Sequence, residues 1–524
     1  MKKIAKILVC LLAVCMFLPA MASCNEKDKK PTGNQNKRPT SEEESTDPDA
    51  HIEKPELVDM DGYTYKAYVR DFAGDSLDEQ LANGNNNYKC IDFWIDEANS
   101  ELDVISFAVY TRNNRIEADY NCKIRQRASN GSQVDALKQF YTNGEQYDLT
   151  IISAKPAAQA ATQNLLRDLN QLTYADLTRP SFDQNSISEL SLENMLYFVS
   201  GDMNISTLEV AGLSLVNMKF YDKLKDSIVN DLFGGDATYS DIYNVVTAQK
   251  WTMDTMLRIA SLANVDVDKN DGADLSVIDK GDTIGYHQYF YSTIWYFYAS
   301  GGRITAKNDN DIPQLTIQEN TNQNLADYLY NHFNHVISNP WIPHAGSAVL
   351  DENFLTGQVL FMDCSLFEVR TQIYPYASFE YGILPCPVYE EYQGYHSVIY
   401  FNNWAHLWAI PNLVDNLENA ERMFEIMAVY SSLSDSTMAA YYDRTIYFNA
   451  ARDNGSRKVM TEIKQSLVYD IALIFDWGGL EKMLERISFE NDNPYGNAVS
   501  GIESRLNPVI ENTIEQLRTS TTGN

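Results

Sequence analysis

Residues 121–152 read NCKIRQRASNGSQVDALKQFYTNGEQYDLTII, and this stretch decides the fold class. Asn121–Arg125 is a predicted strand, Val134–Tyr141 has the periodicity of a helix, and Tyr147–Ile152 is a predicted buried strand. Gly144 marks the turn after the helix. A strand, a helix and a second strand in this order predict an α/β fold with a mostly parallel sheet.

The chain before this stretch continues the same alternation. The folded part is expected to begin near Met60, with one strand at Tyr63–Val69 and a second at Cys90–Trp94. Asp103 can cap a helix that runs through Ala118, because its carboxylate can accept a hydrogen bond from a backbone N–H of the first turn.

The remainder is predicted to be mixed, with a mainly helical region from about Leu213 to Tyr330 and no internal repeat. The further predicted elements are the strand-like runs Val359–Phe361 and Ile399–Ile410 and the helices Glu418–Tyr430, Arg457–Phe475 and Gly501–Leu517.

The N-terminal residues have the order of a secretory signal peptide. A basic start precedes an apolar run from Ile7 to Leu18, which at about 12 residues is too short for a bilayer that needs roughly 20. Small residues lead to Cys24, which resembles the lipobox of bacterial lipoproteins, although Met21 stands where Leu is usual. The resemblance implies that residues 1–23 are removed and that Cys24 carries lipid chains. Residues 24–57 are polar, lack apolar periodicity and are predicted to be a disordered tether.

Size and charge limit the classes of partner. The chain has 524 residues, of which 44% are hydrophobic, so it can bury a large core in two or three domains. Its formal net charge of −31 would repel a phosphate backbone, which argues against nucleic-acid partners. A neutral or cationic small solute is compatible with this charge.

Four cysteines follow Cys24 without the C-x-x-C spacing of a zinc or redox site: Cys90, Cys122, Cys364 and Cys386. An exported location permits disulfides, and the local pairs would be Cys90–Cys122 and Cys364–Cys386. Reduced, buried thiols are the alternative, and the sequence leaves both open.

Short blocks follow one another over nearly the whole chain after Cys24. They include Ala108–Asn113, Tyr147–Leu149, Leu166–Asn170, Pro180–Gln184, Trp251–Asp254, Gly281–Gly285, Tyr441–Asp443, and Tyr469-Asp470 with Trp477. In order and spacing they resemble family 1 of the bacterial extracellular solute-binding proteins, the substrate receptors of ATP-binding-cassette (ABC) importers. Val216–Lys219 departs from the Phe-Asn-Lys that is frequent in the family, so ligand specificity does not transfer.

The resemblance implies an α/β, two-lobed periplasmic-binding-protein-like fold of type II, with hinge crossovers and an interlobe cleft. One lobe would hold residues 58–205 and 397–435, and the other 206–396 and 436–520. The implied function is capture of a small solute for a separate ABC permease, and an oligosaccharide is the expected solute. We expect no catalysis and no cofactor. The expected location is the outer face of the cytoplasmic membrane of a Gram-positive cell, with lipid as the sole anchor, and we expect a monomer.

Candidate solute contacts stand at predicted strand ends, because ligands of open α/β sheets bind beyond the carboxyl ends of the strands. They are Arg70, Asp71, Trp94, Asp96, Glu97, Ser153, Trp295 on an aromatic helix, Trp404 in the later apolar run, and Asp476 with Trp477 in a loop. Aromatic rings can cover the apolar face of a sugar, while carboxylates and Arg take its hydroxyls. Core packing, strand-end caps and salt bridges are the alternative roles of the same residues.

Asp266-x-Asp268-x-Asn270 resembles a calcium loop, because hard oxygen ligands recur at alternating positions. Gly272 comes one residue late, and no Glu occupies the final ligand position. The pattern therefore favours a solvated acidic turn, and no metal is predicted.

Two other functions stay open. A lipid-anchored glycoside hydrolase needs two carboxylates across one sugar, and Asp and Glu are too frequent here for their presence to discriminate. The sequence has no G-x-S-x-G, no H-E-x-x-H and no phosphate-binding P-loop. A surface glycan-binding adhesin would share the cleft without a permease.

Overall fold

The structure is a computed structural model that describes residues 48–70, 92–129, 132–265, 267, 281–289, 291–333, 344–345, 352–400, 405–450, 453–487 and 492–522. Residues 49–524 form one compact unit. The predicted signal peptide, Cys24 and the tether up to residue 47 lie outside the described residues. Within the described part, no helix combines the length and the apolar character that crossing a membrane requires.

The last residues of the predicted tether contact the folded unit. The Asp49 carboxylate accepts a hydrogen bond from the Ser434 N–H at 2.9 Å. The Tyr120 hydroxyl donates to the carbonyl of Pro55 at 3.2 Å. Residues 49–55 therefore lie against the fold instead of extending from it.

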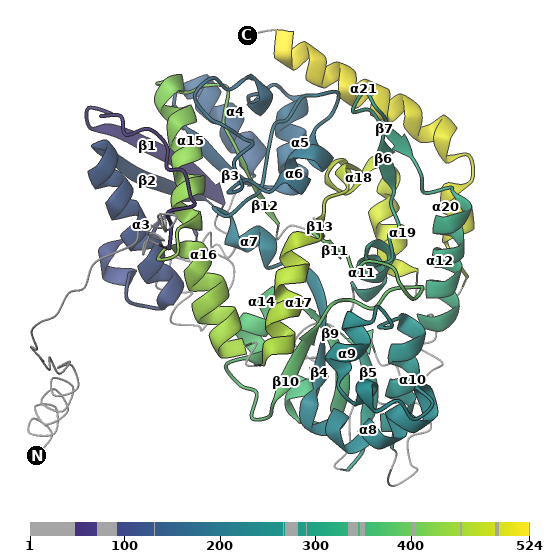
Figure 1. Cartoon of the computed structure of the whole chain (residues 1–524). Helices are drawn as coiled ribbons and strands as arrows, with labels where there is room; N and C mark the ends of the chain where they lie inside the picture. Colours follow the sequence, from purple (N-terminus) through teal and green to yellow (C-terminus); the bar gives the residue numbers. More distant parts are fainter. Residues whose placement is uncertain are drawn as a thin grey trace, which may run out of the picture. The chain divides into compact units, whose positions relative to one another are not determined.

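The first sheet has the strand order β12–β3–β1–β2 (Figure 1). Its strands are β1 (Tyr63–Arg70), β2 (Cys122–Ser129), β3 (Leu149–Ser153) and β12 (His406–Ala409). β1 pairs in parallel with β2 and β3, and β12 pairs antiparallel with β3. The mostly parallel sheet predicted from residues 121–152 is confirmed.

Local capping signals set the ends of the helices that connect these strands. α3 (Val104–Tyr120) begins after Asp103, whose carboxylate accepts a hydrogen bond from a first-turn N–H at 2.8 Å. It ends at Asn121, which is left-handed with φ 47°. α4 (Gln133–Asn143) ends at Gly144 with φ 68°, a conformation that glycine adopts without steric cost.

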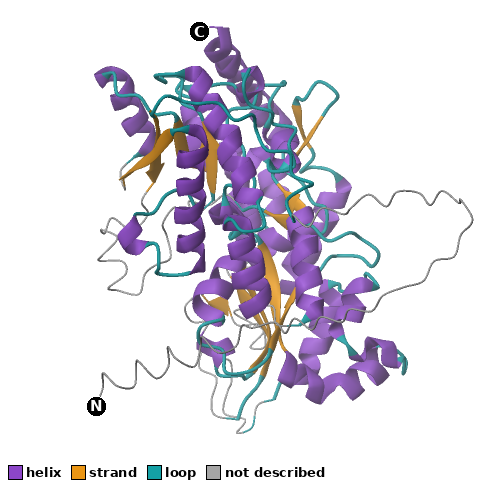
Figure 2. Cartoon of the chain, turned by 60° about the vertical axis from the view of Figure 1, so that its left-hand side comes forward, coloured by secondary structure: helices purple, strands orange, loops and turns teal. Residues whose placement is uncertain are grey.

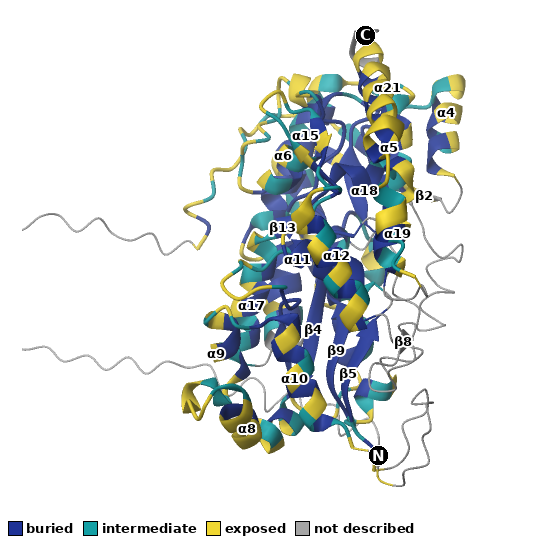
Figure 3. Cartoon of the chain, turned by 90° about the vertical axis from the view of Figure 1, so that its right-hand side faces the viewer, coloured by how far each residue is buried: buried dark blue, intermediate teal, exposed yellow. Residues whose placement is uncertain are grey.

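The second sheet has the strand order β10–β4–β9–β5–β8 and forms a separate group of strands flanked by helices (Figure 2). Its strands are β4 (Gly212–Asn217), β5 (Ile284–Tyr289), β8 (His344–Ala345), β9 (Val359–Ser365) and β10 (Tyr381–Leu384). β5 is parallel to β8 and β9, whereas β4 is antiparallel to β9 and β10. β4, β5 and β9 are buried along their whole length (Figure 3).

The remaining elements cover the two sheets and join them. The other helices are α5 (Ala154–Thr162), α6 (Gln184–Leu190), α7 (Ile205–Leu208), α8 (Met218–Leu232), α9 (Ile242–Thr247), α10 (Met253–Ala263), α11 (Ser292–Ala299), α12 (Asn320–Phe333), α14 (Leu366–Glu368), α15 (Leu417–Ser432), α16 (Thr437–Ala439), α17 (Asn454–Gln465), α18 (Ile471–Phe475), α19 (Leu480–Arg486), α20 (Tyr495–Val499) and α21 (Ile502–Thr522). Two short sheets pair β6 (Thr305–Lys307) with β7 (Pro313–Leu315) and β11 (Ser397–Val398) with β13 (Leu467–Val468). Wide π-type turns span Val369–Ile373 and Ala440–Ala450.

A buried carboxylate fixes α11 on the second sheet. Asp363, in the middle of β9, is fully buried and accepts hydrogen bonds from the hydroxyls of Ser214 at 2.7 Å, Ser292 at 2.6 Å and Tyr296 at 2.7 Å. The Tyr286 hydroxyl also donates to it. Because a buried charge is costly unless it is fully hydrogen-bonded, this network holds α11 in one position.

Two predicted elements differ from the structure. Asp92–Trp94, the described part of the predicted strand Cys90–Trp94, is a turn followed by irregular chain. The predicted helix Arg457–Phe475 is interrupted, because Leu467-Val468 leave the helix to pair with β11.

The described cysteines are reduced and buried: Cys122, Cys364 and Cys386. This excludes the Cys364–Cys386 disulfide in the structure, and Cys90 lies outside the described residues. Burial raises the pKa of the Cys122 thiol to about 12, so this thiol is held protonated.

Candidate functional site

The candidate site lies where strands of both sheets end. β3 ends at Ser153, whose backbone N–H donates to the Gln133 side-chain oxygen at 3.0 Å, and the chain then enters α5. In the second sheet, the parallel strands β5 and β9 end at Tyr289 and Ser365. In open α/β sheets, such carboxyl ends are where ligands bind.

Four aromatic side chains gather beyond the end of β5. The rings of Tyr289 and Trp295 stack with centroids 5.2 Å apart and planes 14° apart. Tyr291 lies edge-on to both, and its ring centroid is 4.8 Å from that of Tyr400. Tyr291 is half-buried, whereas the other three are buried. Tyr400 follows β11, so the group joins the β5–α11 turn to the segment that leads toward the first sheet.

Carboxylates and one lysine adjoin these rings. The Lys155 ammonium, in the first turn of α5, lies 2.5 Å from a Glu481 carboxylate oxygen and 3.3 Å from an Asp476 oxygen. The Tyr400 hydroxyl donates to Glu485 at 3.2 Å. We refer to Lys155, Tyr289, Tyr291, Trp295, Tyr400, Asp476, Glu481 and Glu485 as the strand-end cluster.

Burial shifts the protonation equilibria of the strand-end cluster. Burial raises the pKa of Glu481, although its ion pair with Lys155 acts in the opposite direction. Burial and the neighbouring Glu481 charge likewise raise the pKa of Glu485. For Lys155, burial alone would lower the pKa, but its interactions with Glu481 and Asp476 together outweigh burial and raise the pKa. The cluster therefore carries more acidic than basic groups in a partly desolvated place.

At the carboxyl end of β9, polar side chains are hydrogen-bonded or ion-paired to one another. Ser365 and Glu368 form a capping box at the start of α14, in which the Ser365 N–H donates to Glu368 at 2.8 Å. Arg370 pairs with Glu209, with one nitrogen–oxygen distance of 3.0 Å. These groups hold the short α14 and the following π-type turn beside the strand-end cluster.

Three of the sequence-predicted contacts lie in or next to this cluster. Trp295 and Asp476 belong to it, and Ser153 ends the strand that leads to Lys155. Trp477, next to Asp476, is instead buried, stacks on Phe475 and donates a hydrogen bond from its ring N–H to the Thr513 hydroxyl at 3.3 Å.

The other predicted contacts lie in the chain before α3, at the end of β1, or outside the described residues. Trp94 is half-buried and packs on the core, and the Asp96 carboxylate accepts the Asn99 N–H at 2.9 Å as a turn cap. Glu97 is exposed. Arg70 is the last residue of β1, and its side chain is not among those described. Asp71 and Trp404 lie outside the described residues.

The weak calcium candidates Asp266, Asp268 and Asn270 also lie outside the described residues. In the part of the chain that the structure describes, no group of three His, Cys, Asp or Glu side chains could hold a metal ion.

The predicted contacts did not include the other members of the strand-end cluster: Lys155, Tyr289, Tyr291, Tyr400, Glu481 and Glu485. Lys155 stands three positions after the predicted buried strand and two after Ser153, so a slightly wider strand-end rule would also have selected it. Glu481 and Glu485 lie one helical turn apart on α19, a helix far from any predicted strand end. No local signal identifies them, because only tertiary packing brings them to Lys155 and Tyr400.

The strand-end cluster offers groups that suit a sugar. Aromatic rings can contact the C–H face of a pyranose, carboxylates can accept hydrogen bonds from its hydroxyls, and the lysine can donate to ring or glycosidic oxygens. Nothing in the cluster requires a metal or cofactor.

Comparisons with solved structures show the fold. A cyclo/maltodextrin-binding protein in complex with maltotetraose matches 88% of this chain and 99% of its own, with a TM-score of 0.51 and 12% identity. The extracellular solute-binding protein of Staphylococcus aureus in complex with maltose matches 86% of this chain and 98% of its own, with a TM-score of 0.51 and 11% identity.

A third structure agrees with these two. The galacto-N-biose-/lacto-N-biose I-binding protein of an ABC transporter of Bifidobacterium longum, in complex with lacto-N-biose, matches 87% of this chain and 98% of its own, with a TM-score of 0.50 and 11% identity. No family model matches the chain, and no curated protein matches it in sequence. The three structural matches show that the chain has the two-lobed α/β fold of the periplasmic-binding-protein type.

Proposed function

We propose that the protein captures an oligosaccharide outside the cytoplasmic membrane and delivers it unaltered to an ABC importer. The observation that carries this proposal is the strand-end cluster. Aromatic rings beyond β5 and on α11, carboxylates on α19 and the Lys155 ammonium of α5 converge there, in a fold whose solved examples include proteins in complex with sugars. Lipid on Cys24 would keep the receptor at the membrane, and the importer would be a separate chain.

The elements of the cluster suggest how binding and lobe closure are coupled. Lys155 follows β3 of the first sheet, whereas Tyr289 and Tyr291 follow β5 of the second. A sugar that touches both sets of side chains stabilises the arrangement in which they approach each other, so binding shifts the protein toward a closed state. In this proposal the lobes are residues 58–205 with 397–435 and 206–396 with 436–520, and Trp94 and Trp404 stay in the candidate set.

The charges of the cluster favour a neutral sugar over an anionic one. Lys155 is held between Glu481 and Asp476, and Glu485 adds a further carboxylate. A uronic acid or sugar phosphate would bring another negative charge to this partly buried place, at an electrostatic cost.

A thermal-shift screen tests the proposal. The protein is heated with mono- and oligosaccharides, peptides and amines, and a ligand of the folded state raises the melting temperature by mass action. We expect at least one neutral oligosaccharide to raise it, and chromatography of the incubated mixture to recover that sugar intact. Hydrolysis of the sugar would favour the glycoside hydrolase, and the absence of any sugar hit would contradict the proposal.

A further inference from the structure

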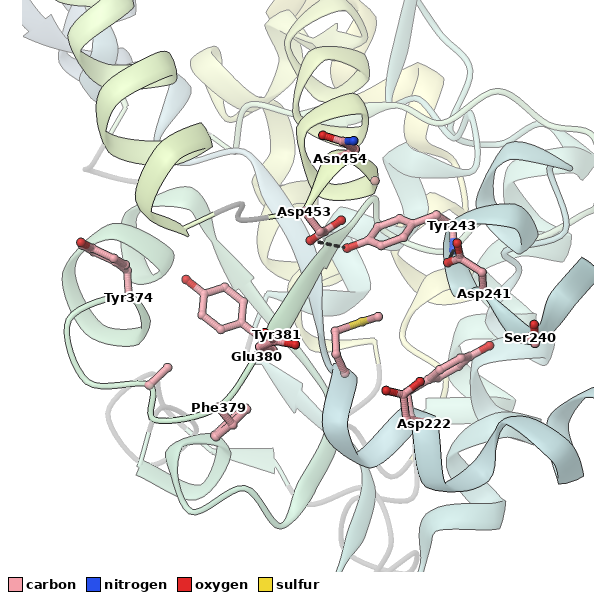
Figure 4. Close-up of a pocket in the computed structure, with 14 residues that line it drawn as sticks. Asp222, Ser240, Asp241, Tyr243, Tyr374, Phe379, Glu380, Tyr381, Asp453 and Asn454 are labelled. Carbon is pink, nitrogen blue, oxygen red and sulfur yellow. Dashed lines mark hydrogen bonds between the residues drawn. The ribbon is translucent and has the colours of Figure 1, made fainter.

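A cavity lies at the opposite end of the second sheet from the strand-end cluster. It has a volume of about 470 Å³ and surrounds the start of β10, where Tyr381 pairs with Asn217 at the end of β4 (Figure 4). Ser365, which ends β9 near the strand-end cluster, pairs with Gly212 at the other end of β4. The two places are therefore separated by the length of that strand.

The wall of this cavity is built around Tyr243 of α9. Its ring lies so close to Gly455 that a Cβ there would come within 2.2 Å of a ring carbon. A Cβ on Gly382 would come within 2.4 Å of the Tyr243 hydroxyl. That hydroxyl donates to Asp453 at 3.1 Å and lies 2.6 Å from the Ser456 hydroxyl. These contacts fix the ring before any ligand arrives, which lowers the entropic cost of binding.

Aromatic rings and carboxylates dominate the lining. Tyr221, Tyr243, Tyr374, Phe379 and Tyr381 contribute rings, and Asp222, Asp241, Glu380 and Asp453 contribute carboxylates. None of these described lining residues is Lys, Arg or His. Lys219 and Lys223 of α8 line an adjoining cavity of about 220 Å³, which shares Phe379 with this one.

Two of the carboxylates hold the scaffold, and two are exposed. Asp241 accepts the Tyr243 N–H at 3.0 Å and caps α9, and Asp453 accepts the Ser456 N–H at 2.8 Å and caps α17. The Asp222 side chain is 65% exposed and lies 4.0 Å from Lys225, and Glu380 is also exposed. Asp222 and Glu380 can therefore be changed without removing a cap.

We propose that this cavity binds a small organic cation, an alkylammonium compound. A cation over aromatic faces is attracted by the ring quadrupole, and nearby carboxylates balance its charge. The volume lies in the range of small-molecule sites. An anion would be repelled by the four carboxylates of the lining. The site is independent of the strand-end cluster and of the sugar proposed there.

Choline and its neutral isostere 3,3-dimethylbutan-1-ol are the probes, measured by calorimetry with the whole protein at low and high salt. We expect choline to bind with an affinity about tenfold above that of the isostere, in line with a cation–aromatic contact, and to weaken as salt rises. Equal affinity for the two probes, or no choline binding at millimolar concentration, would overturn the proposal.

Variants locate the site. Glu380→Gln and Asp222→Asn are each expected to weaken choline binding by about threefold or more. Asp231→Asn, an exposed carboxylate on the same helix α8 outside the lining, is the matched control and should leave binding unchanged. Tyr291→Ala in the strand-end cluster should also leave it unchanged. An equal loss in Asp231→Asn would show diffuse counterion binding and overturn the proposal, and circular dichroism verifies that each variant is folded.

Discussion

The rings of Tyr291 and Tyr400 lie 4.8 Å apart with a tilt of 56° between their planes. Tyr291 directly precedes α11 and follows the end of β5 by two positions, and Tyr400 lies between β11 and β12. The Tyr400 hydroxyl donates to Glu485, so the ring pair is anchored to the acidic side of the strand-end cluster. Because Tyr291 is half-buried, it is the ring of the pair with the most surface left for a ligand.

Tyr291→Ala is expected to weaken oligosaccharide binding by about 1–2 kcal/mol, which is about fivefold to thirtyfold in Kd, because the ring would no longer cover the sugar face. Calorimetry with the best sugar measures the change. Tyr376→Ala is the control, since its ring is 68% exposed in a different part of the fold. An unchanged Kd in Tyr291→Ala, or an equal loss in Tyr376→Ala, would remove Tyr291 from the site.

Glu189 gives a pH dependence of stability. Burial raises its pKa to about 7, although its carboxylate accepts the Tyr469 N–H. A raised pKa means that the folded state holds the proton more tightly than the unfolded chain does. The stabilisation is therefore complete below the ordinary pKa of 4.5 and is lost as the pH rises through about 7.

Glu189→Gln removes this titration and keeps an acceptor oxygen. Between pH 4.5 and 7.5, the free energy of unfolding of the wild type should fall as Glu189 loses its proton. In Glu189→Gln we expect this fall to be smaller by about 2 kcal/mol. Denaturant titrations at several pH values measure the difference, with the exposed Glu511→Gln as control. If the wild-type and Glu189→Gln curves run parallel, the assignment is wrong.

Gly285 in β5 permits close contact with α10. A Cβ at this position would lie 1.9 Å from the backbone oxygen of Ala260, which cannot move aside as a flexible side chain could. Gly285→Ala is therefore expected to destabilise the protein by about 1–3 kcal/mol or more, as overpacking does. Gly496→Ala has open space at its Cβ and should be neutral in the same thermal melt. Equal melting temperatures for the two variants would contradict this packing.

The buried thiols should resist modification. Cys122, Cys364 and Cys386 are reduced, and burial raises the pKa of Cys386 well above its ordinary value. The thiolate is the reactive form, so iodoacetamide should label these three positions only after unfolding. Peptide mass spectrometry reads each position separately. Rapid labelling of Cys364 or Cys386 in the native protein would show that β9 and the chain after β10 are packed differently.

The fold could be predicted wherever local signals carry it. Asp103, Asn121 and Gly144 cap their own helices, so α3, β2, α4 and β3 appear where the sequence places them. The helix predicted over Arg457–Phe475 is wrong in its middle, because Leu467-Val468 pair with β11, about 70 residues earlier in the chain. Pairing over such a distance leaves no periodic trace in a local window.

Only part of the candidate site could be predicted from the sequence. The strand-end rule leads to Ser153. Asp476 is named from its loop, and Trp295 is named from its aromatic helix. Tyr400 and Glu485 meet across 85 positions of the chain, and their contact depends on how α19 packs beside α11. The strand-end rule identifies residues at the ends of strands. It does not identify residues on the helices that pack against those ends.

Capture of an unaltered oligosaccharide is tested most directly by calorimetric titration of the protein with neutral oligosaccharides. Mass spectrometry then measures the ligand recovered from the calorimeter cell. We expect saturable one-to-one binding of at least one such sugar, loss of affinity in Tyr291→Ala, and recovery of the sugar with its mass unchanged. Absence of binding across the oligosaccharide series, or recovery of cleaved sugar, would contradict this proposal.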